Sequence, residues 1–201
     1  MPHYFENPPS DHAVREFAIA IRGHEFRFIT DRGVFSRERI DPGTLFLAKT
    51  MEIAPTDTVL DLGCGYGALG IVAAYLAPQG RVHLVDRNPR AVELAVHNLT
   101  LNRITNAEIH LGEGTAPVLG IAFDVAVMNP PIRAGRETVL TLMREAHAVL
   151  RPGGGLYFVA RTKQGAQTLA TRCAGVFGNC AEVAKQSGYR VYCATKKAGP
   201  A

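Results

Sequence analysis

The apolar positions of the chain change their spacing at about residue 56. From there on, short apolar runs of strand length alternate with segments whose apolar residues recur at helical spacing. Such alternation is typical of a parallel sheet with right-handed crossovers, and we therefore predict an α/β fold with a doubly wound, mostly parallel, seven-stranded sheet over residues 56–201. Residues 151–155, Arg-Pro-Gly-Gly-Gly, are predicted to be a turn that starts the fifth strand. The strands are expected at 58–62, 81–86, 107–111, 122–128, 156–160, 180–184 and 189–194. Helices are expected at 68–77, 89–101 and 164–176, and a further helix after the fourth strand should end at about residue 149.

Residues 1–55 form a lead-in that we expect to pack on the core, so that the chain makes one structural domain. Residues 24–30 alternate polar and apolar positions like a strand, 31–33 read as a turn, and 34–36 start a second short strand, which together predict a hairpin. A short amphipathic segment is expected before it, because apolar residues recur at helical spacing at Val14, Phe17, Ala18 and Ile21.

A short helix is expected at residues 45–51, directly before the seven-stranded region. The sequence Asp-Pro-Gly-Thr precedes it and is typical of a helix entry. Asp41 and Thr44 are the two candidates for the residue that caps its N-terminus.

The first strand of the core contains an acid and runs into a glycine turn. Asp61 precedes three alternating glycines in Asp-Leu-Gly-Cys-Gly-Tyr-Gly. Gly65, Gly67 and Gly70 also satisfy the dinucleotide pattern G-x-G-x-x-G, so an NAD or FAD site must be considered. A carboxylate at this point would repel a pyrophosphate, whereas it suits S-adenosylmethionine, which carries an ammonium and a sulfonium and no phosphate. The turn therefore favours S-adenosylmethionine, with a tight turn that binds no ligand as the alternative.

A second acid, Asp86, ends the next strand 25 residues further on. A carboxylate at this place in a doubly wound sheet reaches the ribose hydroxyls of an adenosine group, whichever cofactor carries it. The alternative is that Asp86 caps the helix that begins near Pro89. After the third strand, the loop 112–114 should border the adenine, with Glu113 as an acceptor for its amino group. Cys64, inside the glycine turn, is interpreted as a small packing residue and not as a nucleophile.

The tetrapeptide Asn129-Pro130-Pro131-Ile132 follows the fourth strand. Ligands of open α/β sheets bind outside the carboxyl ends of the strands, so this segment should face the same crevice as the glycine turn. The prolines stiffen the loop, which leaves the carbonyls of Asn129 and Pro130, with the Asn129 side-chain oxygen, to accept from a substrate amine. Such acceptors would orient an exocyclic or amide nitrogen for methyl transfer. The alternative is a rigid loop with a structural Asn.

Composition and charge bear on the location of the protein and on its partners. The chain has 201 residues, of which 47% are hydrophobic, no apolar run reaches the ~20 residues of a membrane span, and the N-terminus lacks a signal-peptide core. We expect a cytoplasmic protein with no membrane partner. Four cysteines without a C-x-x-C pair and seven histidines without H-E-x-x-H indicate neither a metal nor a disulfide framework. Residues 151–201 carry eight Lys or Arg and one acid, which fits either a phosphate-binding face or a solvated surface.

The motifs at 61–67, 85–91 and 129–135 resemble the class I S-adenosylmethionine-dependent methyltransferases of the small domain family. Tyr4, Phe5 and the segments 28–36, 40–44, 163–165 and 177–179 also resemble it, so the likeness spans nearly the whole chain. It is strongest with the catalytic half of the small-subunit ribosomal RNA guanine-N2 methyltransferases and with single-domain relatives of that half, and it implies a Rossmann-like fold. The residues and the resemblance together predict that the cofactor is bound by Asp61, Gly63, Cys64, Gly65, Gly67, Asp86, Arg87, Glu113, Gly114 and Asn129, the target amine by Asn129, Pro130, Pro131 and Ile132, and flanking phosphates by Arg133, Arg136 and Lys163.

Three departures from the family pattern bear on the substrate. The two-domain ribosomal enzymes have an extra N-terminal domain with no counterpart in this sequence, and Glu113 stands where related enzymes often have Asp. Ile132 stands where adenine- and glutamine-modifying relatives usually place Tyr or Phe, which favours guanine. We expect an RNA methyltransferase that modifies an exocyclic base amine, guanine N2 in ribosomal RNA, on a base that is flipped out or single-stranded. The alternatives are methylation of adenine, protein glutamine or a small metabolite, a non-catalytic S-adenosylmethionine- or RNA-binding module, and an NAD-dependent oxidoreductase. The oligomeric state is left open.

Overall fold

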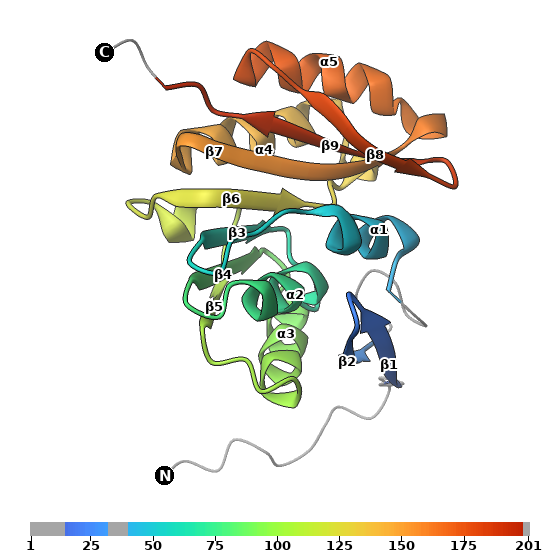
Figure 1. The fold of residues 1–201 in the computed structure, drawn as a ribbon, viewed down its shortest axis with the longest axis vertical. Coiled ribbons are helices and arrows are strands. Elements are labelled where there is room, and N and C mark those ends of the chain that lie inside the picture. The colour runs from blue at the N-terminus through green and yellow to red at the C-terminus, as the bar shows by residue number, and fades with distance from the viewer. Residues whose placement is uncertain (1–14, 32–39, 199–201) are drawn as a thin grey trace.

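The computed structural model describes residues 15–31 and 40–198, and its main sheet has seven strands in the order β5-β4-β3-β6-β7-β9-β8 (Figure 1). β9 is antiparallel to both of its neighbours, and the other pairs are parallel. The predicted doubly wound, mostly parallel sheet is therefore confirmed. The strands are β3 (Thr58–Leu62), β4 (Arg81–Asp86), β5 (Ala107–Leu111), β6 (Phe123–Met128), β7 (Leu150–Arg161), β8 (Ala181–Gln186) and β9 (Tyr189–Thr195).

Helices cover both faces of this sheet, which explains why its strands read as almost continuous apolar runs. Val59 of β3 packs in the cluster formed with α1, α2 and α3, whereas its neighbour Leu60 packs in the cluster formed with α4 and α5. Chain order reverses between β3 and β6, and this switch point is where open α/β sheets bind ligands. The helices are α1 (Pro42–Thr50), α2 (Ala68–Leu76), α3 (Pro89–Leu101), α4 (Arg136–Val149) and α5 (Ala166–Phe177), with short 3-10 turns η1 (Ala116–Val118), η2 (Ile132–Ala134) and η3 (Thr162–Gln164).

The lead-in contains a hairpin, but its strands differ from those predicted. β1 (Arg15–Ile21) pairs antiparallel with β2 (His24–Thr30) around the turn residues Arg22 and Gly23, which both have positive φ. The helical interpretation of the positions from Val14 to Ile21 is therefore wrong for the described part, because pairing with β2 and burial of Ile21 favour the extended chain. The second strand predicted at 34–36 lies outside the described residues.

Two asparagines, Asn98 on α3 and Asn102 at its C-terminal cap, bind the backbone of β2. Asn98 is fully buried, accepts from Ile29 N (2.7 Å) and donates to the carbonyls of Ile29 and Tyr66 (2.9 Å each). One turn later, Asn102 accepts from Arg27 N (2.9 Å) and donates to its carbonyl (2.6 Å). The side-chain amides thus satisfy backbone groups of the hairpin and join it to the core.

Two further details correct or refine the predicted elements. The segment 151–155 is part of β7 and not a turn before it, because its glycines allow the strand to shift register between Phe123 and Val125 of β6. Asp41 caps α1 by accepting from Thr44 N (3.0 Å), so Thr44 is not the cap. Within the described part of the chain, no helix is both long and apolar enough to cross a membrane.

Candidate active site

A cavity of about 610 Å³ opens at the carboxyl ends of the central strands. The segments that follow β3, β4, β5 and β6 line it, together with the start of α1 and the neighbouring ends of β7 and β9. Its volume lies in the range typical of sites for small molecules and cofactors. All ten residues predicted to bind the cofactor except Gly67 line this cavity.

The glycines of the turn have two different structural roles. Gly63 (φ +74°) and Gly65 (φ +57°) have the left-handed conformation that favours glycine, and a Cβ atom on either would meet no atom within 4 Å. A Cβ atom on Gly70 would instead lie 2.4 Å from Leu84 Cδ2. The first two glycines therefore keep space free on the cavity side, while Gly70 allows α2 to pack closely on β4.

Asp61 lies beneath this turn, with only 1% of its surface exposed. Its Oδ2 accepts from Gly70 N (2.7 Å), whereas its Oδ1 is buried and has no hydrogen-bond partner. Burial raises the pKa of Asp61 to about 7, the bond from Gly70 opposes this rise, and the charge of Asp86 adds to it. The carboxylate thus costs stability until a cation or a donor reaches it from the cavity.

Asp86 ties β4 to the glycine turn. Its Oδ2 accepts from Gly65 N (2.8 Å) and its Oδ1 from Asn88 N (2.9 Å). Asn88 caps α3 by accepting from Arg90 N (3.0 Å), so the alternative interpretation of Asp86 as the helix cap is wrong. Each carboxylate oxygen keeps further lone-pair sites for a ligand at the cavity.

The rim near the expected adenine position is made by charged residues from two loops. Arg87 after β4 and Glu113 after β5 form an ion pair (3.6 Å) between exposed side chains. Glu145 of α4 supports the loop by accepting from Thr115 N (3.1 Å), next to Gly114. Glu113 is therefore partnered from the protein side, and its contact with adenine stays a prediction.

Cys64 is buried within the turn. Burial, followed by the charges of Asp61 and Asp86, raises the pKa of its thiol well above the usual range. The thiolate form is therefore disfavoured, which agrees with a packing role and not with a nucleophile.

Asn129 is oriented by residues from the other end of the chain. Its Nδ2 donates to Thr44 Oγ1 (2.8 Å) and to Asp41 Oδ2 (3.1 Å), both at the start of α1. Because the two bonds fix the nitrogen, they also define the amide oxygen, which accepts no hydrogen bond from the described residues. Asn129 lines the cavity and so has a free acceptor there.

The prolines after Asn129 form a tighter loop than predicted. The Pro130 carbonyl accepts from Ile132 N (2.8 Å), around Pro131 at φ −74° and ψ 74°, which is an inverse γ-turn. The expectation that this carbonyl is wholly free is therefore wrong, although its second lone pair remains. Ile132 is half-buried and packs against the α4 and α5 cluster at the edge of the cavity.

Among the cavity residues that were not predicted as functional are Asp41, Thr44 and Tyr189, whereas Arg161 belongs to the basic residues of 151–201 considered as a phosphate-binding face. Asp41 and Thr44 showed only the signal of a helix cap, and their approach to Asn129 depends on the tertiary fold. Tyr189 begins β9 opposite Arg161, which ends β7, and the Arg161 guanidinium lies 4.8 Å from the centre of the Tyr189 ring. Because β9 is antiparallel, its first residue lies at the carboxyl edge of the sheet, and only the strand order could have indicated this.

The basic residues predicted to bind phosphate fall into different groups. Arg133 lines the cavity, whereas Arg136 and Lys163 are exposed outside it. No ion pair to these three is found within the described residues. Among the basic residues of 151–201, several already have partners, which reduces the surface available to a nucleic acid: Arg151 pairs with Asp124, Arg172 with Glu137, Arg190 with Glu182, and Lys196 donates to the carbonyls of Ala148 and Leu150.

Comparison with known proteins identifies relatives along most of the chain. It is 32% identical over 197 residues to the uncharacterised protein YbxB of Bacillus subtilis (strain 168), covering 96% of this chain and 98% of that protein. It is 31% identical over 195 residues to the ribosomal RNA small subunit methyltransferase C of Pseudomonas putida (strain W619), covering 95% of this chain and 57% of that enzyme. The chain thus spans nearly all of YbxB but little more than half of the ribosomal RNA methyltransferase.

This chain also matches only about half of a related protein whose structure is solved. The T. thermophilus 16S rRNA N2 G1207 methyltransferase, solved with AdoMet and guanosine, superposes with a TM-score of 0.81 at 28% identity, over 96% of this chain and 53% of that one. The sequence model of the methyltransferase small domain matches residues 25–193. The chain therefore belongs to the methyltransferase small domain family, as its motifs predicted.

Proposed function

We propose that this protein transfers a methyl group from S-adenosylmethionine to the exocyclic N2 amine of guanine in ribosomal RNA. The observation that carries the proposal is the orientation of Asn129, whose nitrogen is held by Asp41 and Thr44 and whose oxygen is free in the cavity. The solved relative with AdoMet and guanosine supports the same pair of ligands. Since the chain spans about half of that relative, the RNA substrate is a proposal for this chain alone.

The residues around the glycine turn fit S-adenosylmethionine. Asp61 has a buried oxygen without a partner, and Gly63 and Gly65 leave open space above it. When bound, S-adenosylmethionine supplies a methyl group on a positively charged sulfonium. A buried carboxylate favours such a cation more strongly than a surface carboxylate does, because the local dielectric constant is lower.

Asn129 and the following carbonyls provide the chemistry on the substrate side. The lone pair of an exocyclic amine is conjugated into the base, so the nitrogen is a weak nucleophile. Hydrogen bonds from its two hydrogens to Asn129 Oδ1 and to a backbone carbonyl favour a pyramidal nitrogen and direct its lone pair into the cavity. We therefore assign the rate to orientation and electrostatics rather than to a strong base.

The surroundings of the cavity suit a nucleobase. Tyr189 offers a ring face beside the cavity, and Arg133 and Arg161 add positive charge at its rim. A base that enters the cavity must leave its stack, and its flanking phosphates then lie outside, near Arg136 and Lys163. A cytoplasmic location also remains part of the proposal.

The test is transfer of labelled methyl from S-adenosylmethionine to separate acceptors. Purified protein is incubated with small and large ribosomal subunits, with the naked RNA of each, and with protein and small-molecule fractions from cells lacking the gene. We expect label in ribosomal RNA, recovered as N2-methylguanosine after digestion. Label in adenosine or in protein alone would contradict the proposed substrate, while the Asn129→Ala variant, with cofactor binding intact, serves as the matched inactive control.

A further inference from the structure

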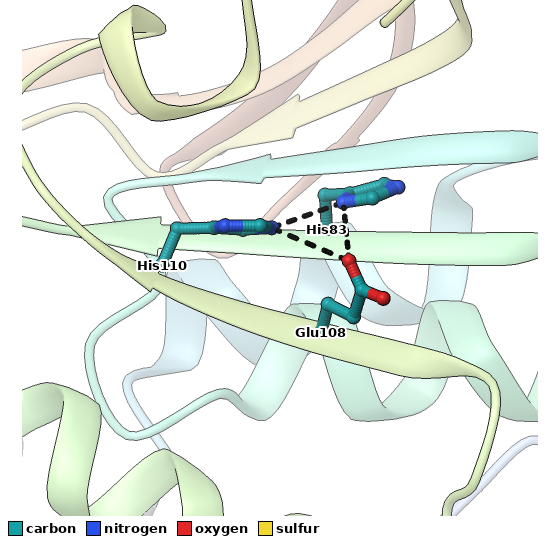
Figure 2. Close-up of side chains that lie close together, drawn as sticks. All are labelled: His83, Glu108 and His110. Carbon is teal, nitrogen blue, oxygen red and sulfur yellow. Dashed lines mark hydrogen bonds and ion pairs between the residues drawn. The ribbon is translucent and has the colours of Figure 1, made fainter.

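Three side chains converge on the sheet at a place that the methyltransferase reaction does not use. His83 lies on β4, and Glu108 and His110 lie on the edge strand β5 (Figure 2). His83 Nδ1 is 3.0 Å from His110 Nε2 and 3.6 Å from Glu108 Oε2, and the last two atoms are 3.9 Å apart. None of the three lines the cavity.

Strand pairing brings these residues together. His83 is the register partner of Glu108, and His110 follows Glu108 by two positions, so all three side chains lie on one face of the sheet. Figure 2 shows the two imidazole rings pointing toward each other with the carboxylate below them. This face is covered by α4 and α5 over the other half of the sheet, whereas at β5 the short turn η1 packs on it. The cluster is therefore held by rigid strands and is open to solvent on one side.

The three atoms have the spacing of ligands around one metal ion. The circle through points separated by 3.0, 3.6 and 3.9 Å has a radius of about 2.1 Å. Zn²⁺ binds histidine nitrogen at roughly 2.0–2.1 Å and carboxylate oxygen at roughly 2.0–2.2 Å. An ion slightly above the plane of the three atoms needs only small movements of the side chains.

Neighbouring residues orient Glu108 and His83. Arg81 donates to Glu108 Oε1, which leaves Oε2 facing the histidines. The edge of the Phe123 ring packs on His83, whose side chain is only 7% exposed, against 22% for His110 and 45% for Glu108.

We propose that His83, Glu108 and His110 form a binding site for a divalent transition-metal ion, best suited to Zn²⁺, with water as the fourth ligand on the solvent side. Two imidazoles and a carboxylate are a ligand set typical of zinc. The ligand atoms are His83 Nδ1 and His110 Nε2, so the ring protons lie on His83 Nε2 and His110 Nδ1. The hydrogen bond between the rings is replaced by two bonds to the metal.

Such an ion would connect β4 to the edge strand β5. The loops that follow these strands carry Arg87 and Glu113 at the rim of the cavity. The site is thus a structural clamp beside the active site and not part of the transfer reaction. The absence of C-x-x-C and H-E-x-x-H motifs gave the expectation of no metal. Glu108 follows His83 by 25 residues, and no spacing motif links them.

The test uses the full chain without a polyhistidine tag, after removal of metals with a chelator. Zn²⁺, Co²⁺ and Mg²⁺ are added separately, and binding is measured by calorimetry, by the melting temperature and, for Co²⁺, by visible absorption. At about 100-fold excess of Zn²⁺ over its Kd, the melting temperature should rise by roughly 5–10 °C. Mg²⁺ should have no effect, because it prefers octahedral oxygen ligands.

Variants then assign the site. His110→Gln and Glu108→Gln change exposed or half-exposed ligands and should weaken Zn²⁺ binding by at least about tenfold, or about 1.4 kcal/mol. His97→Gln, at an exposed histidine of α3, is the matched control and should leave binding unchanged. A Zn²⁺ affinity that is the same in all variants, or no Zn²⁺ binding by the wild-type chain, would overturn the proposal and leave a metal-free polar cluster.

Discussion

Replacing Asp61 with Asn should stabilise the protein without ligand and weaken its affinity for S-adenosylmethionine. The carboxylate is fully buried and one of its oxygens lacks a partner. Asn keeps an oxygen that can accept from Gly70 N and removes the buried charge. The substitution therefore separates two effects of this charge: it lowers the free energy of unfolding of the ligand-free protein, and it raises the affinity for S-adenosylmethionine.

The size of the stabilisation by Asp61→Asn and its pH dependence follow from the pKa of Asp61, which is raised to about 7. Between pH 4 and pH 7 the folded protein binds more protons at Asp61 than the unfolded chain does, so the free energy of unfolding falls as the pH rises. The full cost above pH 7 is at most about 4 kcal/mol, at about 1.4 kcal/mol for each pH unit. Relief of about 1–4 kcal/mol corresponds to a rise in melting temperature of roughly 3–12 °C for a chain of this size.

The assay is thermal unfolding of wild type and Asp61→Asn at pH 8 and at pH 5, without ligand. The variant should melt at higher temperature at pH 8, and the difference should shrink to roughly a third at pH 5, where the carboxyl is protonated in the folded wild type and still ionised in the unfolded chain. A variant that is less stable at pH 8, or a difference independent of pH, would refute the reasoning.

Binding provides the second half of this test. Near pH 7, S-adenosylmethionine should displace roughly half a proton from Asp61, measurable as a dependence of the calorimetric enthalpy on the ionisation enthalpy of the buffer. In the variant this dependence should disappear, and the affinity should fall by roughly 10- to 100-fold, because a charge-assisted contact is lost. Unchanged affinity would show that the carboxylate does not act on the cofactor.

Three further predictions concern the supports of the site. Thr44→Val removes one of the bonds that orient Asn129, so kcat should fall by roughly 10- to 100-fold while calorimetry gives an unchanged affinity for S-adenosylhomocysteine. Gly63→Ala and the control Gly120→Ala both add a Cβ in open space at positive φ, and each should lower the free energy of unfolding, measured by chemical denaturation, by about 1–2 kcal/mol. Only Gly63→Ala should weaken cofactor binding. An equal loss of cofactor affinity in both variants would contradict the cavity assignment. Asn98→Ala leaves buried backbone groups of the hairpin without partners and should lower the free energy of unfolding by roughly 2–4 kcal/mol. Thermal or urea unfolding measures this loss. A loss no larger than that caused by substituting an exposed residue would refute the role given to this amide.

Patterns within short segments of the sequence predicted the strands of the main sheet and the glycine turn. The apolar runs predicted the seven strands because both faces of each central strand are covered, and the glycines predicted the turn because their positive φ is a property of single residues. The helical interpretation of the segment ending at Ile21 failed for the opposite reason. There, a turn at Arg22 and Gly23 and the amides of α3 decide the conformation.

The parts of the site that were missed are assembled from distant segments. Thr44 and Asn129 are 85 residues apart, and no pattern in either segment indicates that they meet. Tyr189 reaches the cavity only because β9 runs antiparallel in the sheet. The cluster of His83, Glu108 and His110 likewise depends on the register of two strands. Roles of single residues could be predicted where motifs carry them, whereas contacts between elements required the fold.

The most direct test of the central claim is nucleoside analysis of ribosomal RNA by mass spectrometry. It compares cells lacking the gene with cells that express either the wild-type protein or Asn129→Ala at equal abundance. The account predicts that one N2-methylguanosine position is absent without the gene, is restored by the wild-type protein and stays absent with Asn129→Ala. Full restoration by Asn129→Ala, or an unchanged content of N2-methylguanosine in the absence of the gene, would contradict it.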